Sequence, residues 1–174
     1  MRSFTLAIAT LLLLSSCTDD PQPIEPKPTP SVKPTATAPT LPSEATKETP
    51  DGAIAFVAHW IDVFNFSVSS GDLSALRDLN GSKCEGCDIY ENLVAEANKG
   101  ASEVRGFRWT PGKAHLSTER QLEVTVRSRP YEIRKSAGGD WSNVRGDAYR
   151  LGFDLAWANG HWQVEELFQP KDRA

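Results

Sequence analysis

Apolar residues between Ile54 and Val68 recur at steps of three and four, which is the spacing of one face of an α-helix. This spacing predicts a first helix of about four turns, which Thr49 or Asp51 would cap and Ser70-Gly71 would end. Its inward side comprises Ile54, Val57, Trp60, Ile61, Phe64 and Val68. We expect its opposite, solvated side to carry His59, Asp62 and Asn65.

Two further helices follow the first. Residues 72–79 predict a short second helix, which Asn80-Gly81-Ser82 ends. A third helix is expected from about Cys84 to Asn98, and Lys99-Gly100 closes it. Its predicted inward residues are Ile89, Leu93, Val94 and Ala97.

After Gly100 the apolar pattern changes to strict alternation, which is typical of strands that have one buried face. Four alternating runs are centred on residues 107–109, 122–126, 149–157 and 162–164, and they predict four antiparallel strands. Asn159-Gly160 lies between the last two runs and predicts a two-residue type I′ hairpin turn. The alternation slips around Pro130, which indicates a bulge or a bend. The fold class is therefore α+β, with three N-terminal helices packed on a bent four-stranded antiparallel sheet.

The N-terminal segment is of a different kind. Phe4 to Leu14 is an apolar run of 11 residues, and a helix of that length would rise only about 16 Å. The run is followed by Leu14-Ser15-Ser16-Cys17, which matches the lipobox of bacterial lipoproteins. We therefore predict a signal peptide over residues 1–16, cleavage between Ser16 and Cys17, and lipidation of Cys17. The expected location is the extracytoplasmic face of the cell membrane.

Residues 17–50 are expected to form a disordered tether. Nine of the 12 prolines lie between Thr18 and Pro50, and the segment has almost no aliphatic residue to bury. Residues 51–174 contain all five Trp and all three Tyr, so they are predicted to form a single globular domain.

Several motifs together resemble an actinobacterial lipoprotein family known as domain of unknown function 6318. They are Phe56-x-x-x-Trp60 with Asn65, Gly71-Asp72 with Leu76, Cys84-x-x-Cys87, Gly106-x-x-Trp109 and the Asn-Gly-x-Trp hairpin. The resemblance covers about residues 50–168 together with the lipobox and the tether. It implies a cone-shaped α+β fold similar to the nuclear transport factor 2-like and cystatin-like cones. Such cones often hold a pocket between the first helix and the bent sheet, and the possible pocket residues are His59, Trp60, Asp62, Asn65 and Trp109.

Cys84 and Cys87 have three possible roles. Outside the membrane thiols are oxidised, which favours a structural disulfide. A Cys-x-x-Cys pair at a helix start also occurs in redox proteins, but there it follows a strand in a βαβ unit. Zinc would need four ligands, and the sequence has no second Cys pair and no close His pair.

Catalytic signals are few. His59 and Asp62 lie three residues apart, so a His–Asp pair in a cone pocket would be a possible general base, as in an isomerase or hydratase. The alternative is a solvated helix face. No nucleophile motif and no glycine-rich phosphate loop is present. We therefore expect no cofactor, no metal and no assigned catalytic residue.

Charge is unevenly distributed along the domain. Residues 51–103 carry three basic and nine acidic residues, whereas residues 104–150 carry ten basic and five acidic ones. The basic strands are either ordinary solvated faces or a surface for anionic cell-wall polymers or headgroups. Nucleic acid is excluded by the compartment. The sequence thus predicts a lipid-anchored, non-catalytic binding or accessory domain whose partner is a cell-wall polymer, a small ligand or an envelope protein.

Overall fold

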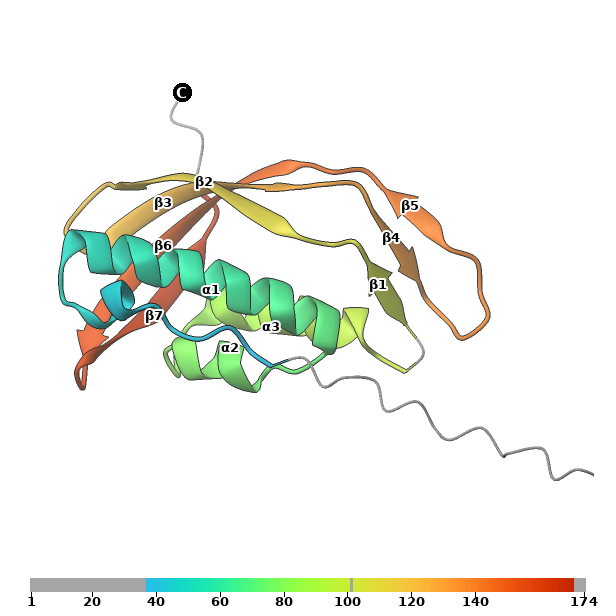
Figure 1. The fold of residues 1–174 in the computed structure, drawn as a ribbon, viewed down its shortest axis with the longest axis horizontal. Helices are drawn as coiled ribbons and strands as arrows, with labels where there is room; N and C mark the ends of the chain where they lie inside the picture. Colours follow the sequence, from blue (N-terminus) through green and yellow to red (C-terminus); the bar gives the residue numbers. More distant parts are fainter. Residues whose placement is uncertain (1–36, 101, 171–174) are drawn as a thin grey trace, which may run out of the picture. The chain divides into compact units, whose positions relative to one another are not determined.

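Helix α1 (Pro50–Ser70) lies along the inner face of a four-stranded antiparallel sheet (Figure 1). The computed structural model describes residues 37–100 and 102–170. Two shorter helices, α2 (Ser74–Leu79) and α3 (Glu85–Ala97), follow α1 in the chain. The three predicted helices are thus confirmed.

The ends of α1 follow the predicted signals. Thr49 is the N-cap, and its hydroxyl accepts a hydrogen bond from the backbone N–H of Gly52 at 3.0 Å. Gly71 ends the helix in the left-handed region at φ 80°. By length and composition α1 would be able to cross a membrane, but 67% of its apolar window is buried inside the domain. This burial is that of a core helix.

Three strands of the four-stranded sheet contain predicted runs, whereas the predicted run at residues 107–109 overlaps the remaining strand only at Trp109. The order of the sheet is β2-β3-β6-β7, and all neighbours are antiparallel. The strands are β2 (Trp109–Leu116), β3 (Gln121–Ser128), β6 (Ala148–Ala158) and β7 (His161–Phe168). Asn159 and Gly160 have φ values of 54° and 80°, which confirms the type I′ turn between β6 and β7.

A second, three-stranded sheet was missed by the sequence analysis. It has the order β1-β4-β5 and comprises β1 (Glu103–Arg105), β4 (Tyr131–Arg134) and β5 (Ser142–Val144). We call this sheet the arm. Each arm strand adjoins a strand of the larger sheet along the chain, and Figure 1 shows these strands bending away together. The predicted bend at Pro130 is therefore confirmed, and it separates β3 from β4.

The core lies between α1 and the four-stranded sheet. Its largest fully buried side chains include Trp60, Phe56, Phe153, Ile61, Leu76, Leu122, Leu151 and Leu155. The alternating residues of β3 and β6 therefore face α1 as the sequence predicts. Trp60 also donates a hydrogen bond from Nε1 to Oδ1 of Asn80 at 2.8 Å, which links α1 to the end of α2.

Two predictions about helix faces are wrong. His59 and Asn65, which were expected to be solvated, are only 6% and 7% exposed. Asn65 is buried because its side chain bonds to the backbone of Trp109 at the start of β2. A short 3-10 helix, η1 (Ser43–Thr46), also packs against α1. Conversely, Ile89 and Leu93 were expected to be buried but are 61% and 56% exposed. Helix α3 buries Val94 and Cys87 instead.

The folded part begins before the predicted boundary at Asp51. Ala45 of η1 is 1% exposed and belongs to the core. Trp162 of β7 donates a hydrogen bond from Nε1 to the carbonyl oxygen of Lys47 at 2.8 Å. The last residues of the predicted tether are therefore part of the domain, whereas residues 1–36, including Cys17 and the predicted signal peptide, lie outside the described residues.

A buried amide joins α1 to the edge strand β2. The Asn65 side chain accepts a hydrogen bond from the Trp109 backbone N–H at 2.7 Å, and it donates one to the Trp109 carbonyl oxygen at 2.9 Å. Both backbone groups of Trp109 therefore point away from β3, and the amide satisfies them as a neighbouring strand would. We call this contact the Asn65–Trp109 clamp.

The start of α3 is fixed to β7. Cys84 and Cys87 form a disulfide, as the structural interpretation of this pair predicted. The backbone N–H of Gly86 donates a hydrogen bond to Oε1 of Glu166 at 2.8 Å. A Cβ atom on Gly86 would overlap the carbonyl oxygen of Leu167, so only glycine fits this close approach.

Removal of the clamp should destabilise the domain. We expect Asn65→Ala to lower the free energy of unfolding by about 2–4 kcal/mol, because two buried backbone groups lose their partners. Urea denaturation measures the change. Asn92→Ala, on the exposed side of α3, is the matched control and should shift the free energy by less than about 0.5 kcal/mol. Equal effects of the two substitutions would contradict a structural role for the clamp.

The disulfide should resist reduction in the folded protein, because Cys84 and Cys87 are only 3% and 1% exposed. We expect dithiothreitol to free both thiols only when urea unfolds the chain, as measured by alkylation and mass spectrometry. A Cys84→Ala/Cys87→Ala variant should lose about 2 kcal/mol from the short-loop entropy alone. Rapid reduction without unfolding would instead support a redox role.

Candidate ligand cavity

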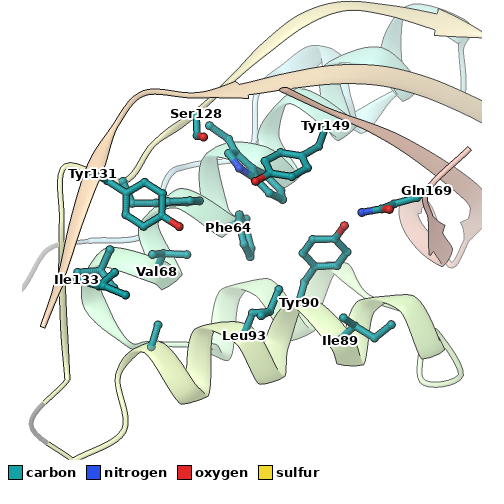
Figure 2. Close-up of a pocket in the computed structure, with 14 residues that line it drawn as sticks. Phe64, Val68, Ile89, Tyr90, Leu93, Ser128, Tyr131, Ile133, Tyr149 and Gln169 are labelled. Atoms are coloured by element: carbon teal, nitrogen blue, oxygen red, sulfur yellow. The ribbon is translucent and has the colours of Figure 1, made fainter. Parts of the chain in front are cut away.

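The main candidate site is a cavity between α3 and the bend of the sheet. It has a volume of about 360 Å³ and opens to solvent (Figure 2). Helix α1 contributes Phe64 and Val68 to its floor, and the chain just after β7 contributes Gln169. The other lining residues are Ile89, Tyr90, Leu93, Ala97, Val104, Phe107, Trp109, Ser128, Tyr131, Ile133 and Tyr149.

The lining divides into an aliphatic and an aromatic set. The aliphatic set is Val68, Ile89, Leu93, Ala97, Val104 and Ile133. The aromatic set is Phe64, Tyr90, Phe107, Trp109, Tyr131 and Tyr149. The two remaining lining residues, Ser128 and Gln169, have polar uncharged side chains, and no lining residue carries a charged side chain. The cavity is thus apolar, with a few neutral hydrogen-bonding groups.

Exposed large hydrophobic side chains gather at this cavity. In the described part of the chain these are Ile89, Leu93 and Tyr149, and all three line it. Ile89 and Leu93 project from one side of α3, where the bend has carried the strands away from the helix (Figure 2). Isolated exposed hydrophobics are common, but their concentration at one hollow is typical of a binding site.

Three tyrosines line the cavity, and two of their hydroxyls point toward its central space. Figure 2 shows the phenol oxygens of Tyr131 in the arm and Tyr149 in β6 facing this space, whereas that of Tyr90 on α3 points toward Gln169. Burial raises the pKa of Tyr90 and of Tyr131, and the nearby Tyr149 adds to both shifts. The Gln169 side chain hydrogen-bonds to Tyr90 and opposes part of its pKa shift. The phenols of Tyr90 and Tyr131 are therefore protonated at neutral pH.

Trp109 connects the cavity to the core. Its ring centroid lies 4.5 Å from that of Phe64 on α1 and 5.7 Å from that of Tyr90 on α3. Phe64 in turn stacks on Trp60 with a centroid distance of 5.6 Å. The Asn65–Trp109 clamp fixes the backbone from which this ring projects.

The predicted pocket residues do not share one site. Trp109 lines the cavity, whereas Asp62 and Asn65 line a second, more open depression next to Phe107. His59 and Trp60 line neither of these two hollows. Of the five predicted pocket residues, Trp109 alone lines the main cavity.

His59 and Asp62 do not form a catalytic pair at the cavity. Burial lowers the pKa of His59 more than the negative charge of Asp62 raises it, so the imidazole is neutral at pH 7. Asp62 is half exposed, and its Oδ1 lies 3.6 Å from Nη2 of Arg108. Among residues 37–100 and 102–170, no three His, Cys, Asp or Glu side chains lie together in a way that would hold a metal ion.

The basic strands are partly neutralised. Arg108 pairs with Asp62, Arg134 with Glu103, and Arg150 with Glu123. In the arm, the Arg105 guanidinium lies 3.8 Å from the Trp141 ring centroid, and that of Arg134 lies 4.9 Å from it. These contacts favour the interpretation of the basic residues as ordinary parts of a solvated sheet face.

The tyrosines and the α3 aliphatics were not recognised as site residues from the sequence. Tyr149 has the inward parity of β6, and Leu93 belongs to the apolar side of α3. Both therefore look like core residues. Only the bend, which separates the arm from α3, turns these positions into cavity walls.

Comparison with solved structures shows similar folds at low identity. The intermembrane space region of chloroplast protein ARC6 has a TM-score of 0.51 at 12% identity, over 68% of this chain and 93% of that one. An NTF2-like protein from Anabaena variabilis has a TM-score of 0.36 at 12% identity, over 78% and 97%. A putative scytalone dehydratase from Novosphingobium aromaticivorans has a TM-score of 0.38 at 10% identity, over 68% and 84%. At these identities the likeness concerns the fold alone.

No protein of curated function is significantly similar in sequence to this chain. A family model, however, matches residues 33–167, which include all the described helices and every cavity-lining residue except Gln169. Most of the chain lies within this match, in agreement with the motifs from Phe56 to the Asn-Gly hairpin. The chain belongs to the family of unknown function DUF6318.

Proposed function

We propose that this domain is a non-catalytic binding domain that holds an apolar small molecule in the cavity between α3 and the bent sheet. The observation that carries the proposal is the gathering of Ile89, Leu93 and Tyr149 at an uncharged hollow. A volume of about 360 Å³ falls within the usual range of ligand pockets, roughly 300–1,000 Å³.

Burial of apolar surface would supply the binding free energy. Each Å² of apolar surface that a ligand removes from water contributes about 25 cal/mol. Ile89 and Leu93 offer such surface because they are more than half exposed in the unliganded domain. A ligand that covered both side chains would therefore remove apolar surface of the protein from water as well as its own, and both areas would contribute to the binding free energy.

The lining offers little for acid–base catalysis. Its ionisable groups are the three tyrosines, and a phenol with a raised pKa is a poor general base at neutral pH. The alternative enzyme with His59 or Asp62 as base lacks support, because neither residue lines the cavity. A thiol-redox role lacks support as well, since Cys84 and Cys87 are buried.

The proposed location of this domain is the outer face of the cell membrane. Its support is the sequence Leu14-Ser15-Ser16-Cys17 after an apolar run, with Cys17 as the lipid acceptor. The proline-rich segment that follows would let the domain reach a ligand carried by the membrane, the cell wall or an envelope protein.

A charge placed in the cavity should weaken binding of an apolar probe. We expect N-phenyl-1-naphthylamine, a neutral fluorophore, to bind the full chain carrying Cys17→Ser, which lacks the proposed lipid acceptor. Leu93→Glu should weaken this binding by at least about tenfold, because the probe would desolvate the new carboxylate. Fluorescence titration measures the affinity.

The control is Asn92→Glu, which adds the same charge to the next residue of α3 but outside the cavity lining. It should leave the affinity unchanged. Circular dichroism and thermal unfolding establish that both variants fold. Equal binding by Leu93→Glu and the unsubstituted chain would overturn the proposed site.

The proposed anchor has its own test. Cys17→Ser should move the protein from the membrane fraction to the soluble exported fraction, because serine provides no thiol for the lipid. Cell fractionation and incorporation of a labelled fatty acid measure this change. Labelling of the unsubstituted chain that persists in the Cys17→Ser variant would contradict lipidation at this residue.

A further inference from the structure

We infer that the ligand is an uncharged ring compound that carries a hydroxyl or carbonyl oxygen. This inference rests on the proposed function, because it concerns the occupant of the same cavity. Three features of the lining support it: the absence of charge, the converging phenol groups and the aromatic walls.

The absence of charged side chains argues against an ionic ligand. None of the 14 lining residues is Asp, Glu, Lys, Arg or His. A carboxylate, phosphate or ammonium group placed among them would lose its hydration without gaining an ion partner, and this loss is large for a charged group. The cavity therefore selects neutral molecules.

The phenol groups call for an oxygen on the ligand. In the part of the chain that the structure describes, the hydroxyls of Tyr131 and Tyr149 have no hydrogen-bond partner. Figure 2 shows both oxygens facing the space that a ligand would fill. A phenol both donates and accepts, so a hydroxyl or a carbonyl oxygen on the ligand would satisfy it. A pure hydrocarbon would bury these hydroxyls without a partner.

The aromatic walls favour a ring over a simple chain. The wall is a continuous cluster, because the ring centroids of Phe64 and Trp109 lie 4.5 Å apart and those of Phe107 and Tyr131 lie 5.2 Å apart. A planar ring placed against this wall gains offset or edge contacts beyond its buried area. The aliphatic set, from Val68 to Ile133, would then accommodate aliphatic substituents of the ring.

A matched series of probes tests the inference. 2-Naphthol, naphthalene, 2-naphthoate and (2-naphthyl)methylammonium share one ring system and differ in a single group. Their affinities follow from displacement of N-phenyl-1-naphthylamine from the Cys17→Ser chain at pH 7. We expect 2-naphthol to bind about 3- to 10-fold more tightly than naphthalene, and at least about tenfold more tightly than either ion. 1-Decanol, an acyclic alcohol with the same number of carbon atoms, should bind more weakly than 2-naphthol.

Two hydroxyl deletions test the role of the phenols. Tyr131→Phe and Tyr149→Phe keep both rings and remove one oxygen each. Each should lower the affinity for 2-naphthol by about 3- to 10-fold, because one hydrogen bond is lost. Their affinity for naphthalene should not change, and this ligand therefore serves as the control for folding and for cavity shape.

The outcomes separate this inference from the proposed function. If the fluorophore binds and Leu93→Glu weakens its binding at least about tenfold, the proposed site holds. The inference would then be overturned if either ion or 1-decanol matched 2-naphthol, or if both phenylalanine variants bound 2-naphthol normally. If the fluorophore failed to bind, or if its binding were insensitive to Leu93→Glu, the proposed site and this inference would fail together.

Discussion

The cavity depends on the hydrogen bonds between the Asn65 side chain and the Trp109 backbone. β2 is an edge strand, so the N–H and C=O groups that Trp109 turns away from β3 have no neighbouring strand. The Asn65 amide provides both partners at a position that is 7% exposed. The start of β2 is therefore held against α1, and the Trp109 ring packs on Phe64 at the junction of core and cavity. Loss of this contact would release the strand end that forms part of the cavity wall.

The second determinant is the break that separates the four-stranded sheet from the arm. Gly106, at φ 72°, lies between β1 and β2, and Pro130 lies between β3 and β4. Gly146 lies between β5 and β6, where a Cβ atom would overlap the carbonyl oxygen of Ser128. The chain therefore bends between β1 and β2, between β3 and β4, and between β5 and β6, each time at a residue that suits a bend. As a result the arm leaves α3 uncovered along Ile89 and Leu93. The hollow results from this backbone geometry, and its apolar lining makes it a candidate ligand site.

Local signals allowed much of the fold to be predicted. The caps of α1, the Asn159-Gly160 turn and the alternation of β3 and β6 each depend on neighbouring residues, and the structure confirms them. The burial of Asn65 depends on its contact with Trp109, 44 residues further along the chain, and no local pattern reveals it. The cavity depends on the arm, whose strands of three and four residues are too short to show alternation. Sequence reasoning therefore found much of the core and the disulfide, and it missed the candidate cavity that the tyrosines line.

The most direct test of this account is the position of a bound probe, measured by intermolecular nuclear Overhauser effects. With N-phenyl-1-naphthylamine bound to the isotopically labelled Cys17→Ser chain, we expect effects from one bound molecule to the methyl groups of Ile89 and Leu93 and to the rings of Tyr131 and Tyr149. These residues belong to α3, the arm and β6, and they come together only at the cavity. Effects confined to other surfaces, such as the outer face of the sheet, would contradict the account.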